Sequence, residues 1–350
     1  MIISFLIIIQ AKMDDNIKRI DTIDTFRIIA AIFVIGIHSK ISDIMPTQIK
    51  NCVDMMFSLA VPFFFITSGY FISNTKDDVE TDGVTENKRL YNNIKKTIQM
   101  YLTWNIIYLP LSIGGEIIYG SSIKNSCWNL IRGWFLVGEN YYSWAFWYLL
   151  ALIVAETIIL IFRKVGISLG MQMIISTILH ISGRILDYLH ACSGIQNTII
   201  DMYFKVFLTT RNGLFLGLFY VSIGMVIRKV KTPDLKKTII FLTISLLITF
   251  FYYPNNKLDI LFTALASVNL FWIIISVKIS SFKGKPHIRD IATTVYLIHM
   301  YFLFWGIEIF KINNRFALFA MVIMSSFVFA ELILKIQCYG WKLSKILHIN

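Results

Sequence analysis

The feature that most constrains this chain is a series of apolar runs, each about 17–20 residues long, separated by charged or turn-forming residues. An α-helix needs about this length to cross a hydrocarbon core of about 30 Å. Hydrophobic residues make up 56% of the chain and charged residues only 15%, whereas soluble domains hold about 45–50% and about 25%. The sequence therefore predicts an all-α, polytopic membrane protein.

The apolar runs define about ten transmembrane helices. They cover residues 27–45, 55–73, 97–113, 144–162, 167–183, 212–228, 238–254, 258–277, 291–310 and 316–335. The longest connections run from 74 to 96 and from 114 to 143. About two-thirds of the 33 Lys and Arg residues fall at the termini and in the loops after even-numbered spans. Because positive loops stay in the cytoplasm, we predict an even number of spans with cytoplasmic N- and C-termini.

Outside these spans the sequence indicates little further organisation. We expect one transmembrane domain over residues 21–340 in the cell membrane, with a cytoplasmic segment at 1–20 and a cytoplasmic tail at 341–350. Met13, followed by polar residues, is a second candidate start beside Met1. The oligomeric state stays open.

Charge and cysteine patterns narrow the classes of partner. The net charge of +12 is scattered between the apolar runs, so we expect the lipid bilayer as partner and no nucleic acid. The four cysteines form no Cys-x-x-Cys pair, and we expect no metal site. There is also no phosphate-cradling glycine loop and no Gly-x-Ser-x-Gly sequence.

Two ionisable residues lie on the first predicted span. Asp24 or Thr25 is a candidate helix cap, and the helix then runs through Arg27 to His38. Eleven residues are about three turns, so both side chains share one face, about 16 Å apart along the axis, and we expect them to open into one chamber. Arg27 is alternatively an interface anchor, and His38 a partner in an interhelical hydrogen bond. Ionisable residues inside membranes are costly and usually functional, which favours a site.

Other residues are weaker candidates. Pro62 predicts a kink in the second span, where Ser68 and Tyr70 are candidate cavity-lining residues and Gly69 allows another backbone to approach. The buried carboxyl of Glu156 is expected to have a structural partner.

Two features predict contacts on the outer side. Arg211 and Asn212, at the start of the sixth span, would recognise an acidic acceptor or else anchor the helix at the interface. The aromatic stretch 128–147 would stack on sugars or form an interfacial belt.

Several stretches together resemble the membrane-bound acyltransferase-3 family. They are Arg27-x10-His38, Ala60-Val-Pro-Phe-Phe-Phe-Ile-Thr-Ser68-Gly69-Tyr70-Phe71, Phe146-Trp147-Tyr148-Leu-Leu-Ala-Leu and Tyr296-Leu-Ile-His299. The resemblance extends from about residue 20 to 335. It adds Trp147, Tyr148 and His299 as candidate binding residues, with His299 near the site but not its catalytic base.

The resemblance implies transfer of an acyl group, usually acetyl from acetyl-CoA, to a hydroxyl of a cell-envelope glycan or a similar acceptor. In that interpretation His38 is the general base or relays the acyl group, and Arg27 contacts the donor's phosphates or fixes the thioester. A positioned base accelerates such a reaction by roughly 10²–10⁴-fold. The planar guanidinium of arginine suits phosphate. No cofactor is expected to be permanently bound.

A transporter is the alternative. The membrane half of vancomycin-resistance serine racemases is similar to the same family, and there the module is thought to supply L-serine. The stretches around Val61-Pro62 and Thr210-Arg211-Asn212-Gly213 resemble that subgroup. Because the chain ends at Asn350 without a racemase domain, we expect acyl transfer rather than transport of a small amino acid.

Overall fold

The computed structural model describes residues 22–73, 83–120, 122–192, 198–252, 259–277 and 288–338. Within these ranges every regular element is a helix. The predicted N-terminal segment 1–20 and the tail 341–350 lie outside the described residues. The all-α fold class is confirmed for the described part of the chain.

Thirteen α-helices and several short turns make up this part of the chain. The α-helices are the N-terminal helix Thr22–Ser39, α2 Thr47–Ser58, α3 Ala60–Ile72, α4 Gly83–Tyr119, α5 Ile123–Arg132, α6 Trp147–Lys164, α7 Leu169–Ala191, α8 Thr198–Phe207, α9 Leu218–Lys229, α10 Leu235–Tyr252, α11 Asp259–Ser276, α12 Ile288–Phe304 and α13 Arg315–Cys338. The short elements are the 3-10 turns η1 Ile41–Ile44 and η3 Trp144–Phe146 and the π-helical turns η2 Gly133–Val137, η4 Gly213–Gly217 and η6 Trp305–Ile309.

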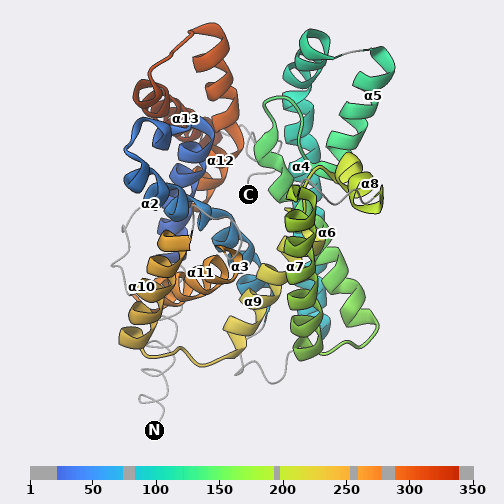
Figure 1. The fold of residues 1–350 in the computed structure, drawn as a ribbon, viewed down its shortest axis with the longest axis vertical. Helices are drawn as coiled ribbons and strands as arrows, with labels where there is room; N and C mark the ends of the chain where they lie inside the picture. The colour runs from blue at the N-terminus through green and yellow to red at the C-terminus, as the bar shows by residue number, and fades with distance from the viewer. Residues whose placement is uncertain are drawn as a thin grey trace.

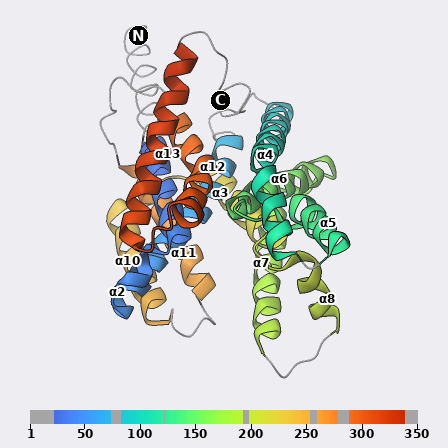
Figure 2. The same cartoon turned by 90° about the horizontal axis from the view of Figure 1, so that it is seen from above.

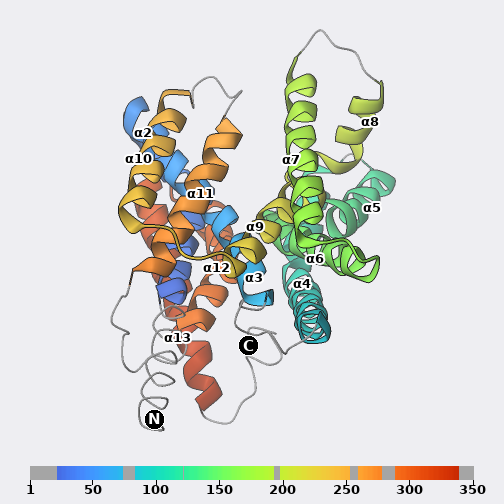
Figure 3. The ribbon, with the colours of Figure 1, turned by 90° about the horizontal axis from the view of Figure 1, so that it is seen from below.

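The helices form two groups. In Figure 1, α2 and α10 to α13 lie on one side and α4 to α8 on the other. The same division is visible from above in Figure 2 and from below in Figure 3. The contact between α3 and α9 joins the groups, while α10 packs on α11 and α12 on α13. Segments that are far apart in the sequence therefore meet where the two groups join.

Among the described residues, six helical segments are long and apolar enough to cross a membrane. They are Thr22–Ser39, Thr47–Ile72, Trp144–Lys164, Leu169–Ala191, Ile288–Ile309 and Arg315–Ile336. The outer faces of these helices expose large apolar side chains, as expected of a surface that faces lipid. The exposed fraction is 59% for Ile178 and 67% for Met324. All ten predicted spans overlap helices, but ten crossings and cytoplasmic termini remain predictions.

Several predicted boundaries are wrong, and two of them concern the N-terminal helix and α4. Asp24 and Thr25, the expected caps, lie inside the N-terminal helix. The helix ends at Ser39, before the predicted end of the span, because the backbone of Lys40 adopts the left-handed conformation (φ 54°). The predicted connection 74–96 is helical from Gly83 onward, as the first turns of α4. Helix α4 therefore carries charged residues that had been assigned to a loop.

The structural features predicted at Pro62 and Gly69 of the second span are confirmed. The helix is interrupted at Leu59, between α2 and α3, because Pro62 lacks the N–H that would bond to the carbonyl one turn earlier. A Cβ on Gly69 would lie 1.9 Å from the carbonyl oxygen of Val221. A Cβ on Gly224 would lie 2.0 Å from that of Ile66, so both glycines are needed where α3 crosses α9.

Candidate functional site

Arg27 lines a cavity of about 620 Å³ that the N-terminal helix shares with α3, α4, α6 and α12. Its guanidinium Nη1 donates to Oδ1 of Asp24 at 2.8 Å, and the guanidinium carbon lies 5.5 Å from the ring centre of Phe71. The side chain is 17% exposed. Arg27 is thus held in place at the cavity wall, with part of its surface accessible.

Three further cations line the same cavity, which we call the basic cavity. Arg89 and Lys96 come from α4, and Arg289 comes from α12. Asp24 is the one carboxylate among the described residues that line it. Arg and Lys side chains in such a concave site favour an anion with several oxygens, such as a phosphate. The basic cavity is suited to a phosphorylated ligand.

The cations on α4 could have been found in the sequence. Arg89, Asn93 and Lys96 are spaced at i, i+4 and i+7, which places them on one helical face. The stripe continues at Met100, and all four residues line the basic cavity. Hydropathy alone does not reveal this face, because the apolar pattern begins only at residue 97 and predicts a loop before it.

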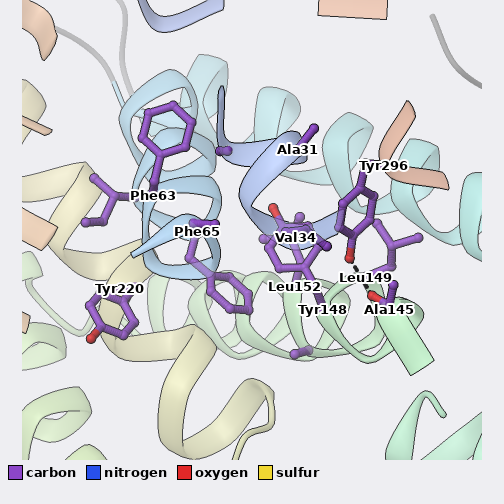
Figure 4. Close-up of a cluster of buried hydrophobic side chains, with 14 of the residues drawn as sticks. Ala31, Val34, Phe63, Phe65, Ala145, Tyr148, Leu149, Leu152, Tyr220 and Tyr296 are labelled. Carbon is purple, nitrogen blue, oxygen red and sulfur yellow. Dashed lines mark hydrogen bonds between the residues drawn. The ribbon is translucent and has the colours of Figure 1, made fainter. Parts of the chain in front are cut away.

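An aromatic partition of Phe64, Tyr148 and Tyr296 lines the basic cavity. The three rings lie pairwise 5.8–5.9 Å apart. The Tyr296 hydroxyl donates to the carbonyl of Ala145, which is drawn as a dashed line in Figure 4. Figure 4 also shows Val34 of the N-terminal helix beside these tyrosines. The hydrogen bond anchors Tyr296 to the start of α6.

His38 does not line the basic cavity. It lies beside His299 of α12, with ring centres 5.5 Å apart, and His299 in turn lies 6.0 Å from the Tyr296 ring of the partition. Ala31 and Val34, which separate Arg27 from His38 on the N-terminal helix, are buried. The expectation that Arg27 and His38 open into one chamber is therefore wrong. Ala31 and Val34 are packed into the core, although the helix keeps the predicted spacing of Arg27 and His38.

The outer-side candidate Arg211 lies over an aromatic ring. Its guanidinium carbon is 5.8 Å from the ring centre of Trp147, and its charge acts on both His38 and Glu139. Burial raises the pKa of Glu139 above its ordinary value, and the positive charge of Arg211 opposes this rise. Arg211, Trp147 and Glu139 thus form a polar and aromatic group on the side of the partition where His38 lies.

Asn212 has a structural position. Its Oδ1 accepts hydrogen bonds from the backbone N–H groups of Leu214 and Phe215, so it caps η4. Its Nδ2 donates to the hydroxyl of Tyr203 at 2.9 Å. Contact with an acceptor remains a prediction for Arg211 and Asn212, and Asn212 would have to give up bonds to make one.

The two candidates from α3 are separated. Ser68 lines the basic cavity, as does Tyr148. Tyr70 does not line it, because its hydroxyl accepts a hydrogen bond of 2.8 Å from Arg228, whose guanidinium also lies 4.7 Å from the Tyr70 ring. The expectation that Tyr70 lines the cavity beside Ser68 is therefore wrong.

Comparison with known proteins identifies relatives of this chain. It is 26% identical over 335 residues to a serine/alanine racemase of Enterococcus gallinarum, covering 91% of this chain and 46% of the relative. It is 25% identical over 339 residues to an amino-acid racemase of Enterococcus faecalis, with the same coverage. The chain thus spans about half the length of these curated relatives. No solved structure matches it.

A family model described as an acyltransferase domain matches residues 20–335. This range contains Arg27, His38, the aromatic partition and every cation of the basic cavity. It begins just before the N-terminal helix and ends within α13. The chain belongs to the acyltransferase-3 family.

Proposed function

We propose that this protein moves an acyl group, most simply acetyl, from acyl-CoA to a hydroxyl of a cell-envelope glycan or a similar acceptor. The basic cavity is the donor site, and His38 acts on the acceptor hydroxyl. Membership of the acyltransferase-3 family supports the reaction class. The observation that carries the assignment is the position of Arg27 in a cavity lined by four cations, three helical turns from His38.

The donor fits the basic cavity by charge and size. Coenzyme A bears phosphates, for which Arg27, Arg89 and Arg289 offer planar donors and Lys96 a point charge. The volume of about 620 Å³ lies within the range of about 300–1,000 Å³ usual for ligand sites. Basic loops favour the cytoplasmic side, where acyl-CoA is made, so we place the mouth of this cavity there.

The acyl group has to pass the aromatic partition. Arg27 and His38 are about 16 Å apart along the helix, so the phosphates and the thioester occupy different parts of the path. Phe64, Tyr148 and Tyr296 line the cavity, and the Tyr296 ring lies 6.0 Å from that of His299, the neighbour of His38. Rotation of the Phe64 ring, which no hydrogen bond holds, would open a route for a thin acyl-bearing arm, while the closed ring would keep water from the thioester.

Transfer then takes one balanced step. The acceptor oxygen bonds to the acyl carbon while its proton moves to a ring nitrogen of His38. The bond between carbon and sulfur breaks, and the protonated His38 returns the proton to the departing thiolate. The products are an ester and free coenzyme A, with no oxidant, reductant or metal required. In this proposal Arg211, whose guanidinium lies over Trp147, contacts an anionic group of the acceptor.

The test uses purified full-length protein in nanodiscs with acyl-labelled acetyl-CoA. We expect the intact protein to release coenzyme A or label an acceptor, and His38→Ala to lower this rate at least about 100-fold. The control is His190→Ala, because His190 stacks on Phe204 near the end of α7 and does not line the basic cavity. Full activity of His38→Ala would contradict the proposal.

The transporter alternative predicts a different result. The names of the two relatives connect them with serine, alanine and amino acids, which motivates a direct comparison. Proteoliposomes would be loaded without acyl-CoA and given labelled L-serine. Uptake that persists in His38→Ala, together with no acyl transfer by the intact protein, would favour a transporter.

A further inference from the structure

His299 is a buried histidine with one ring nitrogen left without a partner. Its exposed fraction is 0%, and its Nδ1 lies 2.6 Å from the backbone carbonyl oxygen of Tyr296, one turn earlier on α12. Its Nε2 is buried and makes no hydrogen bond. Because unpaired buried polar atoms cost free energy, this one calls for an explanation.

The contact with Tyr296 determines where the proton of His299 sits. A carbonyl oxygen can only accept a hydrogen bond, so Nδ1 must carry the hydrogen. In the neutral ring Nε2 then holds a lone pair and can only accept. His299 is thus a neutral acceptor buried in the centre of the helical bundle.

The nearest titratable ring is that of His38. The centres of the two rings are 5.5 Å apart, and their planes are inclined by 37°. At this separation two facing ring nitrogens are at about 3 Å, the usual length of an N–H···N hydrogen bond. The bond is not formed in this structure, where Nε2 of His299 has no partner, and forming it requires the His38 ring to turn a nitrogen toward that atom.

We propose that His299 is a positioning residue that accepts a hydrogen bond from His38 and thereby sets its tautomer. With one nitrogen of His38 committed as a donor to Nε2 of His299, the other must carry the lone pair. That is the form in which His38 can take a proton from a hydroxyl. The inference rests on the proposed role of His38 as the base, and it assigns to His299 no contact with donor or acceptor.

The surrounding contacts keep His299 fixed. The Tyr296 hydroxyl is bonded to the Ala145 carbonyl, so the turn that supplies the His299 acceptor is attached to the start of α6. The neighbouring Leu297 carbonyl accepts from the Tyr108 hydroxyl at 2.9 Å. A rigid support of this kind is what a side chain needs if it is to orient another.

The first test reads the tautomer and needs no activity. Full-length protein labelled with ¹⁵N-histidine is placed in nanodiscs, and two-bond ¹H–¹⁵N correlation assigns the proton on each ring, with His299→Gln identifying the His299 signals. We expect His299 to carry its proton on Nδ1. We expect one nitrogen of His38 to be protonated and hydrogen-bonded in the intact protein. A proton on Nε2 of His299 would overturn the proposal.

The second test uses a matched pair of substitutions. Gln and Met have similar length and volume, but only Gln offers an acceptor near the place of Nε2. We expect His299→Met to lower kcat about 100-fold, because His38 loses its orienting partner. His299→Gln should stay within about tenfold of the intact protein. The KM for acyl-CoA should not change in either variant, because the donor site lies beyond the partition.

The outcomes separate this inference from the proposed function. Equal losses in the Gln and Met variants, with both proteins folded by thermal unfolding, would show that His299 itself acts on the substrate and would overturn the positioning role. Equal retention of activity would overturn it as well. If the intact protein transferred no acyl group, the proposed function would fail. The tautomer measurement would still show whether His38 donates a hydrogen bond to His299.

Discussion

The side-chain amide of Asn93 donates a hydrogen bond of 2.6 Å to Oε1 of Glu156. Glu156 is completely buried on α6, and its other carboxyl oxygen makes no hydrogen bond. The sequence predicted a structural partner for this carboxyl, and the partner is an amide from α4. Because Asn93 also lines the basic cavity, this bond fixes one wall of the proposed donor site.

The Asn93–Glu156 bond predicts different results from two substitutions. Glu156→Gln keeps an oxygen that accepts from Asn93, so the thermal midpoint of the detergent-solubilised protein should change little. Glu156→Ala removes the acceptor and leaves a void, which should cost about 2–4 kcal/mol. The measurement is thermal unfolding followed by tryptophan fluorescence. If Gln proved as destabilising as Ala, a charged carboxylate rather than the hydrogen bond would be the important feature.

The close crossing of α3 and α9 makes Gly69 a sensitive position. A Cβ there would lie 1.9 Å from the Val221 carbonyl, so Gly69→Ala should force the two helices apart and cost about 1–3 kcal/mol or more. The control is Gly114→Ala on α4, where an added Cβ would meet no atom beyond the helix's own backbone within 4 Å. Because alanine is the better helix former, this control should be neutral or slightly stabilising. Equal midpoints for the two variants would contradict the predicted crossing.

The sequence predicts well what depends on local periodicity. The spacing of Arg27 and His38 on one helix follows from 3.6 residues per turn, and the structure keeps both on the N-terminal helix. The helical repeat also explains why the prediction for Tyr70 is wrong. Ser68 and Tyr70 are two residues apart, so on a helix they face different directions, and only Ser68 lines the basic cavity.

Contacts between distant segments could not be predicted in this way. His38 and His299 meet because the N-terminal helix and α12 lie together, although 261 residues separate them in the sequence. The aromatic partition likewise needs α3, α6 and α12 in their observed places. Nothing in the local sequence of any one of these helices specifies the packing of the three.

Glu139 predicts a pH dependence of stability. Burial raises its pKa in the folded protein above the ordinary 4.5, so the folded state binds the proton more tightly than the unfolded state. The stabilisation is therefore present below about pH 4.5 and is lost as the pH rises through the folded pKa. Glu139→Gln should flatten this part of the curve of thermal midpoint against pH. Without the positive charge of Arg211, the pKa of Glu139 should rise further. Arg211→Gln should therefore extend the decline of the thermal midpoint to higher pH. Identical curves for all three proteins would contradict this assignment.

The basic cavity predicts selective losses in donor binding. Arg89→Gln and Lys96→Gln each remove one cation from the cavity wall, and each should raise the KM for acyl-CoA about tenfold, with kcat nearly unchanged. The bonds from these cations to the donor's phosphates lie away from the reacting thioester, so they stabilise the bound substrate and the transition state equally. Losing one should therefore weaken donor binding without slowing the chemical step. Lys236→Gln is the matched control, because Lys236 is exposed on α10 and does not line the cavity. Steady-state kinetics at two salt concentrations makes the measurement, and the intact protein should lose donor affinity as salt screens the cations. Donor KM values in the Arg89 and Lys96 variants that match the Lys236 control would place the phosphates outside this cavity.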